Sequence, residues 1–337
     1  MHSLHFGRLY AGFTPLDKYS MLNTKQKPSL TILVPFYNEE EVIHETLSRM
    51  LEVKKSLDKD LIIDFLFIDD GSDDDSMQIL AAEADSHSFI KIISLSRNFG
   101  HQIAVTAGLQ YATSDWVVII DADLQDPPEL IGEMFGLATS GSFDVVYGRR
   151  KSRQGETLFK KITAATFYRL LSYFCDVDIP VDTGDFRLIS KRVVDVFNSM
   201  PEKHRFVRGM IPWIGFRSAP LLYDRSPRFA GETKYPLRKM LSFAINAITS
   251  FSSKPLTMAI KLGLFIIFMG ILWAIYAVYL RYFTTLALPG FTAILVAIVI
   301  FSGIQIFLLG VIGEYLARIF EEAKARPLFI ISKKINL

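Results

Sequence analysis

The feature that most constrains this chain is an apolar run that ends abruptly in carboxylates, residues 117–128. It begins Val-Val-Ile-Ile, which is typical of a central strand buried on both faces of a parallel sheet. Asp121 and Asp123 follow, and on extended chain both carboxylates would point to one side, where Gln125 adds an oxygen. Oxygen ligands in this number suit Mg2+ or Mn2+ held together with substrate phosphates. An acidic surface turn has a similar composition, but the preceding strand favours a metal site.

Strand-like segments alternate with helix-like segments through the first half of the chain. Besides residues 117–120, we expect strands at 30–34, 61–69, 90–94 and 144–148. The prolines at positions 127 and 128 open a further helix, because proline tolerates the first helical positions. Alternation of this kind predicts an α/β domain with a mainly parallel, doubly wound sheet.

Polar or charged residues follow the carboxyl end of each predicted strand. Ligands of open parallel sheets bind at this edge, so we expect these residues to converge on one pocket. Carboxylates can accept hydrogen bonds from a base or ribose, an Asp-x-Asp pair can hold a metal, and arginine can bind phosphate. The residues are Pro35, Tyr37, Glu39, Asp69, Asp70, Arg97, Asp121, Asp123 and Arg149. Asp, Gly and Ser are also ordinary turn formers, which is the preferred interpretation of residues 73–75.

Two common nucleotide-binding motifs are absent from the sequence. There is no Gly-x-x-x-x-Gly-Lys-Ser/Thr loop and no Gly-x-Gly-x-x-Gly after the first strand, which argues against a nucleotide triphosphatase or a dehydrogenase. Four segments instead match family 2 glycosyltransferases, namely residues 34–40, 68–73, 121–129 and 147–150. The chain therefore resembles that family, whose fold is the Rossmann-like GT-A fold. It most resembles the polyprenyl-phosphate branch, which contains bactoprenol glucosyltransferases and dolichol-phosphate mannose synthases.

The middle of the chain carries features that suit the second substrate. Residues 181–189 return to strand character and resemble the acceptor-side segment of these transferases, with Asp182 and Asp185 near the start. A Gly-containing loop at 223–235 is basic and aromatic. Its candidate phosphate-binding residues are Arg225, Arg228 and Lys234. A solvated charge run is the usual meaning of such a loop, but the interleaved aromatic residues favour acceptor binding.

Apolar helices dominate the remainder. Residues 159–174 and 236–252 have the spacing of amphipathic helices with basic edges, which would lie at a membrane interface or, for the first, on the sheet. Residues 260–279 and 291–312 are each near the ~20 residues that cross a bilayer. Basic residues flank the pair rather than the short connection, so both termini are expected to be cytosolic. Gln305 inside the second span predicts helix packing or homo-oligomerisation.

Five parts are therefore expected. They are an N-terminal tail at 1–29, a GT-A domain at 30–235, an interfacial helix at 236–255, two transmembrane helices at 256–315 and a cytosolic tail at 316–337. The first residues lack the apolar core of a signal peptide. The single cysteine, Cys175, excludes an intramolecular disulfide and a cysteine-rich metal site. The net charge of +2 indicates no particular partner, and no nucleic acid is expected.

A cytosolic nucleotide-sugar pocket beside a membrane hairpin predicts one soluble and one lipid substrate. The resemblance implies metal-dependent, inverting transfer of a sugar, glucose from UDP-glucose, to polyprenyl (undecaprenyl) phosphate at the bacterial inner membrane. It implies catalytic roles for Asp121, Asp123, Arg149 and Asp185. A phosphate monoester is largely a dianion at pH 7, so we expect Asp182 and Asp185 not to be needed as bases.

Other activities remain open at this point. The donor could carry mannose or a modified sugar. A processive polysaccharide synthase shares the fold, but its Gln-x-x-Arg-Trp motif is absent. A non-catalytic sensor of nucleotide sugars would bind the donor without turnover.

Overall fold

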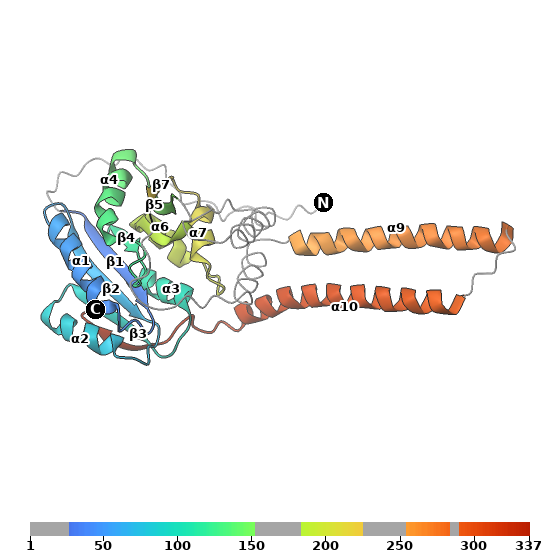
Figure 1. Cartoon of the computed structure of the whole chain (residues 1–337), viewed down its shortest axis with the longest axis horizontal. Coiled ribbons are helices and arrows are strands. Elements are labelled where there is room, and N and C mark those ends of the chain that lie inside the picture. The colour runs from blue at the N-terminus through green and yellow to red at the C-terminus, as the bar shows by residue number, and fades with distance from the viewer. Residues whose placement is uncertain (1–26, 152–182, 225–253, 284–289) are drawn as a thin grey trace, which may run out of the picture.

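An eight-stranded mixed sheet forms the centre of the structure, a computed structural model that describes residues 27–151, 183–224, 254–283 and 290–337 (Figure 1). The strands are β1 (Ser29–Phe36), β2 (Ile62–Asp69), β3 (Ile90–Leu95), β4 (Trp116–Ile119), β5 (Val145–Arg150), β6 (Thr183–Ser190), β7 (Ser218–Tyr223) and β8 (Ile331–Ile335). Their order across the sheet is β7-β5-β6-β4-β1-β2-β3-β8. The predicted α/β class is confirmed.

Parallel pairing joins β1 to β2 and β4, β2 to β3, and β5 to β7. β6 is antiparallel to both of its neighbours, β4 and β5. Because β6 runs against them, its first residues lie at the edge where β4 and β5 end. The antiparallel insertion therefore brings residues near position 185 to the carboxyl ends of the parallel strands.

Helices cover both faces of the sheet. Within the described residues they are α1 (Ile43–Leu57), α2 (Ser76–Ser86), α3 (His101–Tyr111), α4 (Ile131–Gly141), α6 (Lys191–Ser199) and α7 (Val207–Ile214), and a 3-10 turn, Pro128–Leu130, precedes α4. Successive residues of β1 point to opposite faces, as the period of a strand requires. Ile32 packs with α1, α2 and α4, whereas Leu33 packs with α3, α6 and α7. Both side chains are fully buried, so two apolar layers hold the sheet in place.

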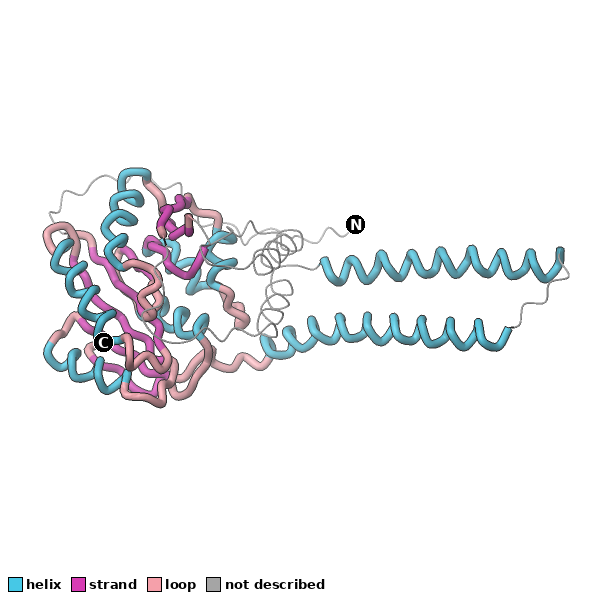
Figure 2. The backbone as a smooth tube through the Cα atoms, in the orientation of Figure 1, coloured by secondary structure: helices cyan, strands magenta, loops and turns pink. Residues whose placement is uncertain are grey.

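Two long helices extend from the domain, α9 (Lys254–Phe283) and α10 (Gly290–Ala323). Figure 2 shows α9 running away from the sheet and α10 returning beside it. Lys254–Trp273 and Ile300–Ala323 are apolar and long enough to cross a membrane, and neither window is buried inside the protein. Many of their large apolar side chains, among those that the structure describes, are exposed, which fits the predicted pair of spanning helices.

Two expectations differ from the structure. Asp121 lies beyond the end of β4 at Ile119, and Asp123 lies in a turn rather than on extended chain, followed by Leu124 with a left-handed backbone of φ 56°. The expected tail at 316–337 contains instead the end of α10 and strand β8, which joins the sheet. The two amphipathic segments, at 159–174 and 236–252, lie outside the described residues.

Candidate active site

A cleft of about 300 Å³ opens at the carboxyl ends of β1, β2 and β4, beside the start of α3. It is lined by Pro35, Phe36, Tyr37, Glu39, Asp70, Asn98, Gly100, His101, Ala104, Asp121, Ala122 and Asp123. Six residues predicted from strand ends therefore meet at one place, namely Pro35, Tyr37, Glu39, Asp70, Asp121 and Asp123. The rule that ligands bind at the carboxyl edge of parallel strands found the cleft.

Five other predicted residues that the structure describes do not line this cleft, among them Asp185, which contacts His101 at its border. Asp69 is buried behind it, and Gln125 lies further along the turn, where its backbone N–H donates to Asp123. Arg97 points its guanidinium over the Phe99 ring, 4.0 Å from the ring centre. Arg149 is exposed near the end of β5. The candidate acceptor residues Arg225, Arg228 and Lys234, like Asp182, lie outside the described residues.

The adjacent carboxylates Asp69 and Asp70 organise the loops around the cleft. Asp69 accepts hydrogen bonds from the Ser72 N–H at 2.8 Å and from the Ser94 hydroxyl at 2.6 Å. Asp70 accepts from the N–H groups of Phe99 at 2.7 Å and Gly100 at 2.9 Å. Both carboxylates are almost fully buried, and burial raises the pKa of Asp70. The loops after β2 and β3 are therefore held together by charge-assisted hydrogen bonds.

Gly71 permits this close approach of the two loops. Its φ is +75°, and a Cβ atom would lie 2.5 Å from the backbone carbonyl carbon of Arg97. Any larger residue would be strained twice, by its left-handed backbone and by the contact with main chain.

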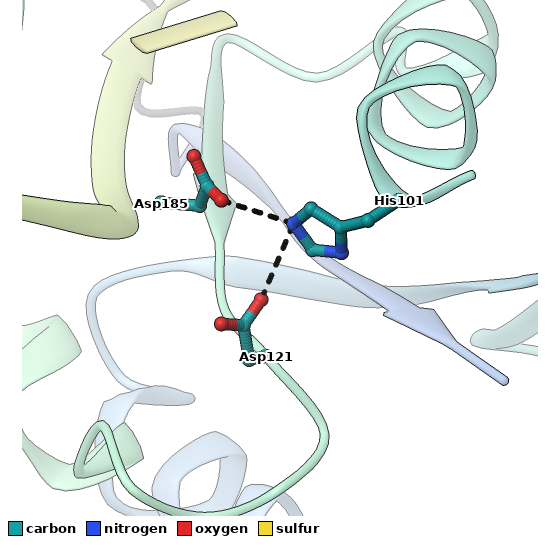
Figure 3. A group of neighbouring side chains, drawn as sticks. All are labelled: His101, Asp121 and Asp185. Atoms are coloured by element: carbon teal, nitrogen blue, oxygen red, sulfur yellow. Dashed lines mark hydrogen bonds and ion pairs between the residues drawn. The ribbon is translucent and has the colours of Figure 1, made fainter. Parts of the chain in front are cut away.

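His101 joins two carboxylates that are far apart in the sequence. Its Nε2 lies 3.0 Å from Asp185 Oδ2 and 3.6 Å from Asp121 Oδ1, pointing between them (Figure 3). Two carboxylate oxygens face this nitrogen, so it must carry a proton when they are ionised. Arg208 completes the cluster with two hydrogen bonds to Asp185, at 2.8 and 2.7 Å. A chain of charges thus runs from the Asp-x-Asp turn to α7.

Burial and mutual contacts shift the pKa values of His101, Asp121 and Asp185. Burial opposes the charged imidazole, but the hydrogen bond to Asp185 and the charge of Asp121 outweigh it and raise the pKa of His101 to about 9. Burial, with the charges of Asp185, Asp126 and Asp123, raises the pKa of Asp121 to about 6. Burial also disfavours ionised Asp185, yet Arg208 and His101 hold its pKa well below the usual range. Asp185 is therefore an ionised carboxylate committed to cationic partners.

The site fits a divalent cation. Asp121 Oδ1 is buried and has no hydrogen-bond partner, so an oxygen ligand is left for another cation. Ligand atoms of His101, Asp121 and Asp185 lie within 4.8 Å of one another, and Asp123 lines the same cleft. Carboxylate oxygens of this kind suit Mg2+ or Mn2+, whereas the protonated imidazole of His101 borders the position without offering it a lone pair.

Three cationic residues of the site were missed by sequence reasoning. His101 follows the third strand at its carboxyl end, the signal that selected Arg97 four residues earlier. Arg208 lies at the start of α7, and nothing in its neighbouring sequence indicates that it reaches Asp185. Arg187, on β6, is buried close to Asp185, and burial lowers its pKa to about 10. Its position follows from the antiparallel insertion of β6, which no local pattern predicts.

Comparison with known families matches residues 31–197 to Glycosyl transferase family 2. An uncharacterized glycosyltransferase YkcC of Bacillus subtilis is 49% identical over 307 residues, covering 91% of this chain and 94% of that protein. A prophage bactoprenol glucosyl transferase homolog of Escherichia coli is 35% identical, covering 90% of this chain and 98% of that protein.

Among solved structures, glucosyl-3-phosphoglycerate synthase from Mycobacterium tuberculosis aligns with a TM-score of 0.46 at 17% identity, covering 66% of this chain and 76% of that chain. The sequence relatives decide the family, because they span almost the whole length of both chains. The chain belongs to glycosyl transferase family 2 and is a glycosyltransferase with the GT-A fold.

Proposed function

We propose that the enzyme transfers glucose from UDP-glucose to polyprenyl phosphate, in bacteria undecaprenyl phosphate, at the cytosolic face of the inner membrane. The observation that carries this is that His101, which lines the cleft, lies between two groups of charged residues. The Asp-x-Asp turn lies on one side, and the Asp185–Arg208 pair lies on the other, with His101 between them. Relatives that are named bactoprenol glucosyl transferase, and match along most of the chain, support the sugar and the lipid.

The donor nucleotide would occupy the part of the cleft formed by β1, β2 and β3. Asp70 faces the cleft, and each of its oxygens already accepts one backbone N–H and can accept a second donor from ribose or base. Asp69 would act from behind by holding the loop. Tyr37 lines the cleft with 41% of its surface exposed, which leaves its ring available to stack on a base.

A divalent cation would be held by Asp121, Asp123 and Gln125, the last of which lies in the same turn. When bound, Mg2+ or Mn2+ neutralises the negative charge that develops on the leaving diphosphate. His101 and Asp185 border this position. Arg149, at the sheet edge, is proposed to bind a substrate phosphate.

The acceptor is proposed to attack without a protein base. A phosphate oxygen of the lipid forms a bond to the anomeric carbon, on the face opposite the departing UDP, and the bond from that carbon to the diphosphate breaks. The dianion has no proton to lose, so inversion yields polyprenyl-phosphate glucose and UDP. Asp185, held ionised by Arg208 and His101, would fix these two cations toward the cleft. Arg225, Arg228 and Lys234 would hold the acceptor phosphate.

The two apolar helices are proposed to place this cleft at the membrane. Both span-length windows have the length and composition of membrane-crossing helices. Both termini would be cytosolic, since basic residues flank the hairpin. Gln305 would support contact between copies of the chain.

The test is a donor and acceptor screen with the purified full chain in lipid nanodiscs. UDP-glucose, UDP-N-acetylglucosamine and GDP-mannose are each offered with undecaprenyl phosphate and Mg2+ or Mn2+. We expect a single-sugar lipid product from UDP-glucose, lost in EDTA. A product from GDP-mannose alone would refute the donor, a polymer would indicate a processive synthase, and nucleotide binding without turnover would indicate a sensor.

A further inference from the structure

The last strand of the catalytic sheet comes from beyond the apolar hairpin. β8 begins eight residues after α10 ends and pairs antiparallel with β3, at the edge of the sheet next to the nucleotide half of the cleft. Without β8, β3 would be an edge strand with unpaired backbone groups. The segment is also packed into the protein, since Phe329 and Ile331 contact the apolar layer on the α3 side and Ile335 contacts the other layer.

A bulge aims one side chain of β8 at Ser94 of β3. Ser94 pairs with Lys333 and Leu95 with Ile331, so Ser332 is an extra residue on β8. Bulges redirect a side chain, and here the Ser332 hydroxyl donates to the Ser94 carbonyl at 3.0 Å and lies 3.3 Å from the Ser94 hydroxyl. That hydroxyl donates to Asp69 at 2.6 Å. β8 therefore contacts the residue that orients Asp69.

A second route leads from β8 to Asp70. The Ser96 N–H donates to the Ile330 carbonyl at 2.9 Å, which ties the start of the loop after β3 to the chain entering β8. The same loop supplies the Phe99 and Gly100 N–H groups that bind Asp70. Asp69, behind the cleft, and Asp70, which lines it, are thus both connected to the C-terminal segment.

The end of β8 is anchored independently. The Asn336 side-chain amide donates to the carbonyls of Ala84 at 2.8 Å and Ile90 at 2.9 Å, which lie at the end of α2 and the start of β3. Lys334 lies 4.3 Å from the centre of the Tyr111 ring on α3. These contacts hold β8 in register along β3, so the bulge at Ser332 stays opposite Ser94.

We propose that β8 is a positioning element for nucleotide binding. It fixes Ser94 and the loop at residues 96–100, and through them the two carboxylates Asp69 and Asp70. The ligand class, a uridine nucleotide, rests on the proposed function. Since β8 follows α10, the nucleotide half of the cleft is complete only after the hairpin has been made and the chain has returned to the domain. A chain cut before the hairpin would lack this strand.

The first test uses point variants of the full chain in nanodiscs, with UDP and Mn2+ as the probe in calorimetric titration. Ser332→Ala combined with Asn336→Ala should weaken UDP binding about fivefold or more, because the two changes remove hydrogen bonds that hold β8 to Ser94 and to the start of β3. The KM for UDP-glucose should rise in proportion, with kcat changing less than about twofold. Ser332→Thr, which keeps the hydroxyl, should bind like wild type, and so should Lys333→Ala, whose exposed side chain makes no hydrogen bond or ion pair with the described residues.

The calorimetric titration also distinguishes misfolding from a mispositioned loop. A partly unfolded sample would bind fewer UDP molecules per chain, whereas a mispositioned loop would bind the same number with a higher Kd. A second test ends the chain after Ile330 and adds a peptide of residues 328–337, which should restore UDP binding by pairing with β3. Wild-type affinity in the double variant would overturn the inference, as would wild-type affinity in the shortened chain without peptide. Failure of the wild-type chain to bind UDP would instead refute the proposed nucleotide.

Discussion

Replacing Asp185 with asparagine removes one charge from a buried cluster while keeping the shape of the side chain. Asp185 is 1% exposed and accepts hydrogen bonds at 2.8 and 2.7 Å from Arg208, with His101 3.0 Å away. Loss of one partner from a buried ion pair costs about 3–5 kcal/mol. We expect about 3 kcal/mol, because water reaches Arg208, whose side chain is 32% exposed.

The assay is thermal unfolding in nanodiscs with EDTA present. A loss of about 3 kcal/mol should lower Tm by about 6–12 °C for a domain of this size. Glu129→Gln is the matched control, since Glu129 also accepts two hydrogen bonds from one arginine, Arg49, but is 52% exposed. Exposed pairs contribute about 1 kcal/mol or less, so its Tm should fall by less than about 4 °C. Equal changes in the two variants would refute the reasoning.

The same Asp185 variant tests whether this carboxylate is a base. Its pKa is held well below the usual range by charges and hydrogen bonds, so it does not titrate near neutral pH. The acidic limb of the turnover profile should therefore survive in Asp185→Asn, governed by the acceptor phosphate with its pKa of ~6. Disappearance of that limb would show that Asp185 takes a proton from the acceptor.

Three further changes have defined outcomes. Gly71→Ala should lower stability by about 2 kcal/mol or more and weaken UDP binding, as read by thermal unfolding and calorimetry, because a Cβ atom would lie 2.5 Å from the Arg97 backbone. The pKa of His101 is raised to about 9, so its contribution to stability is full below its unfolded value near ~6.5 and is lost as pH rises through 9. In EDTA the wild type should lose at most about 1 kcal/mol over that window, because the imidazole is 41% exposed, and His101→Gln should show no such loss in denaturant titrations. Arg228→Ala should raise the KM for polyprenyl phosphate while the Kd for UDP stays at the wild-type value, and equal effects on both would count against its acceptor role.

The cleft was predictable because it follows from local sequence and one topological rule. Apolar strands ending in polar residues are visible in the sequence at Asp70 and Asp121, and parallel strands place such ends together. The exact chain path was not predictable. Asp123 lies in a turn and is followed by Leu124, whose left-handed backbone is uncommon for a leucine.

The rest of the site depends on long-range pairing. β6 inserts antiparallel between β4 and β5, and this places Asp185 beside Asp121, 64 positions earlier in the chain. The sequence Ile-Ser-Lys-Lys-Ile of β8 is too short and too basic to be distinguished from a tail. The segment expected to be a cytosolic tail therefore supplies a strand that pairs with β3.

The most direct test of the metal-dependent glucosyl transfer is the formation of lipid-linked glucose by wild type and Asp123→Ala. Both proteins are purified as full chains, placed in nanodiscs with undecaprenyl phosphate, and supplied with UDP-[14C]glucose and Mn2+. Glu129→Ala is the control, an exposed carboxylate six residues further along the chain that does not line the cleft. We predict labelled lipid from wild type and Glu129→Ala and none from folded Asp123→Ala. Labelled lipid at the wild-type rate from Asp123→Ala, or none from wild type with any nucleotide sugar, would contradict the assignment.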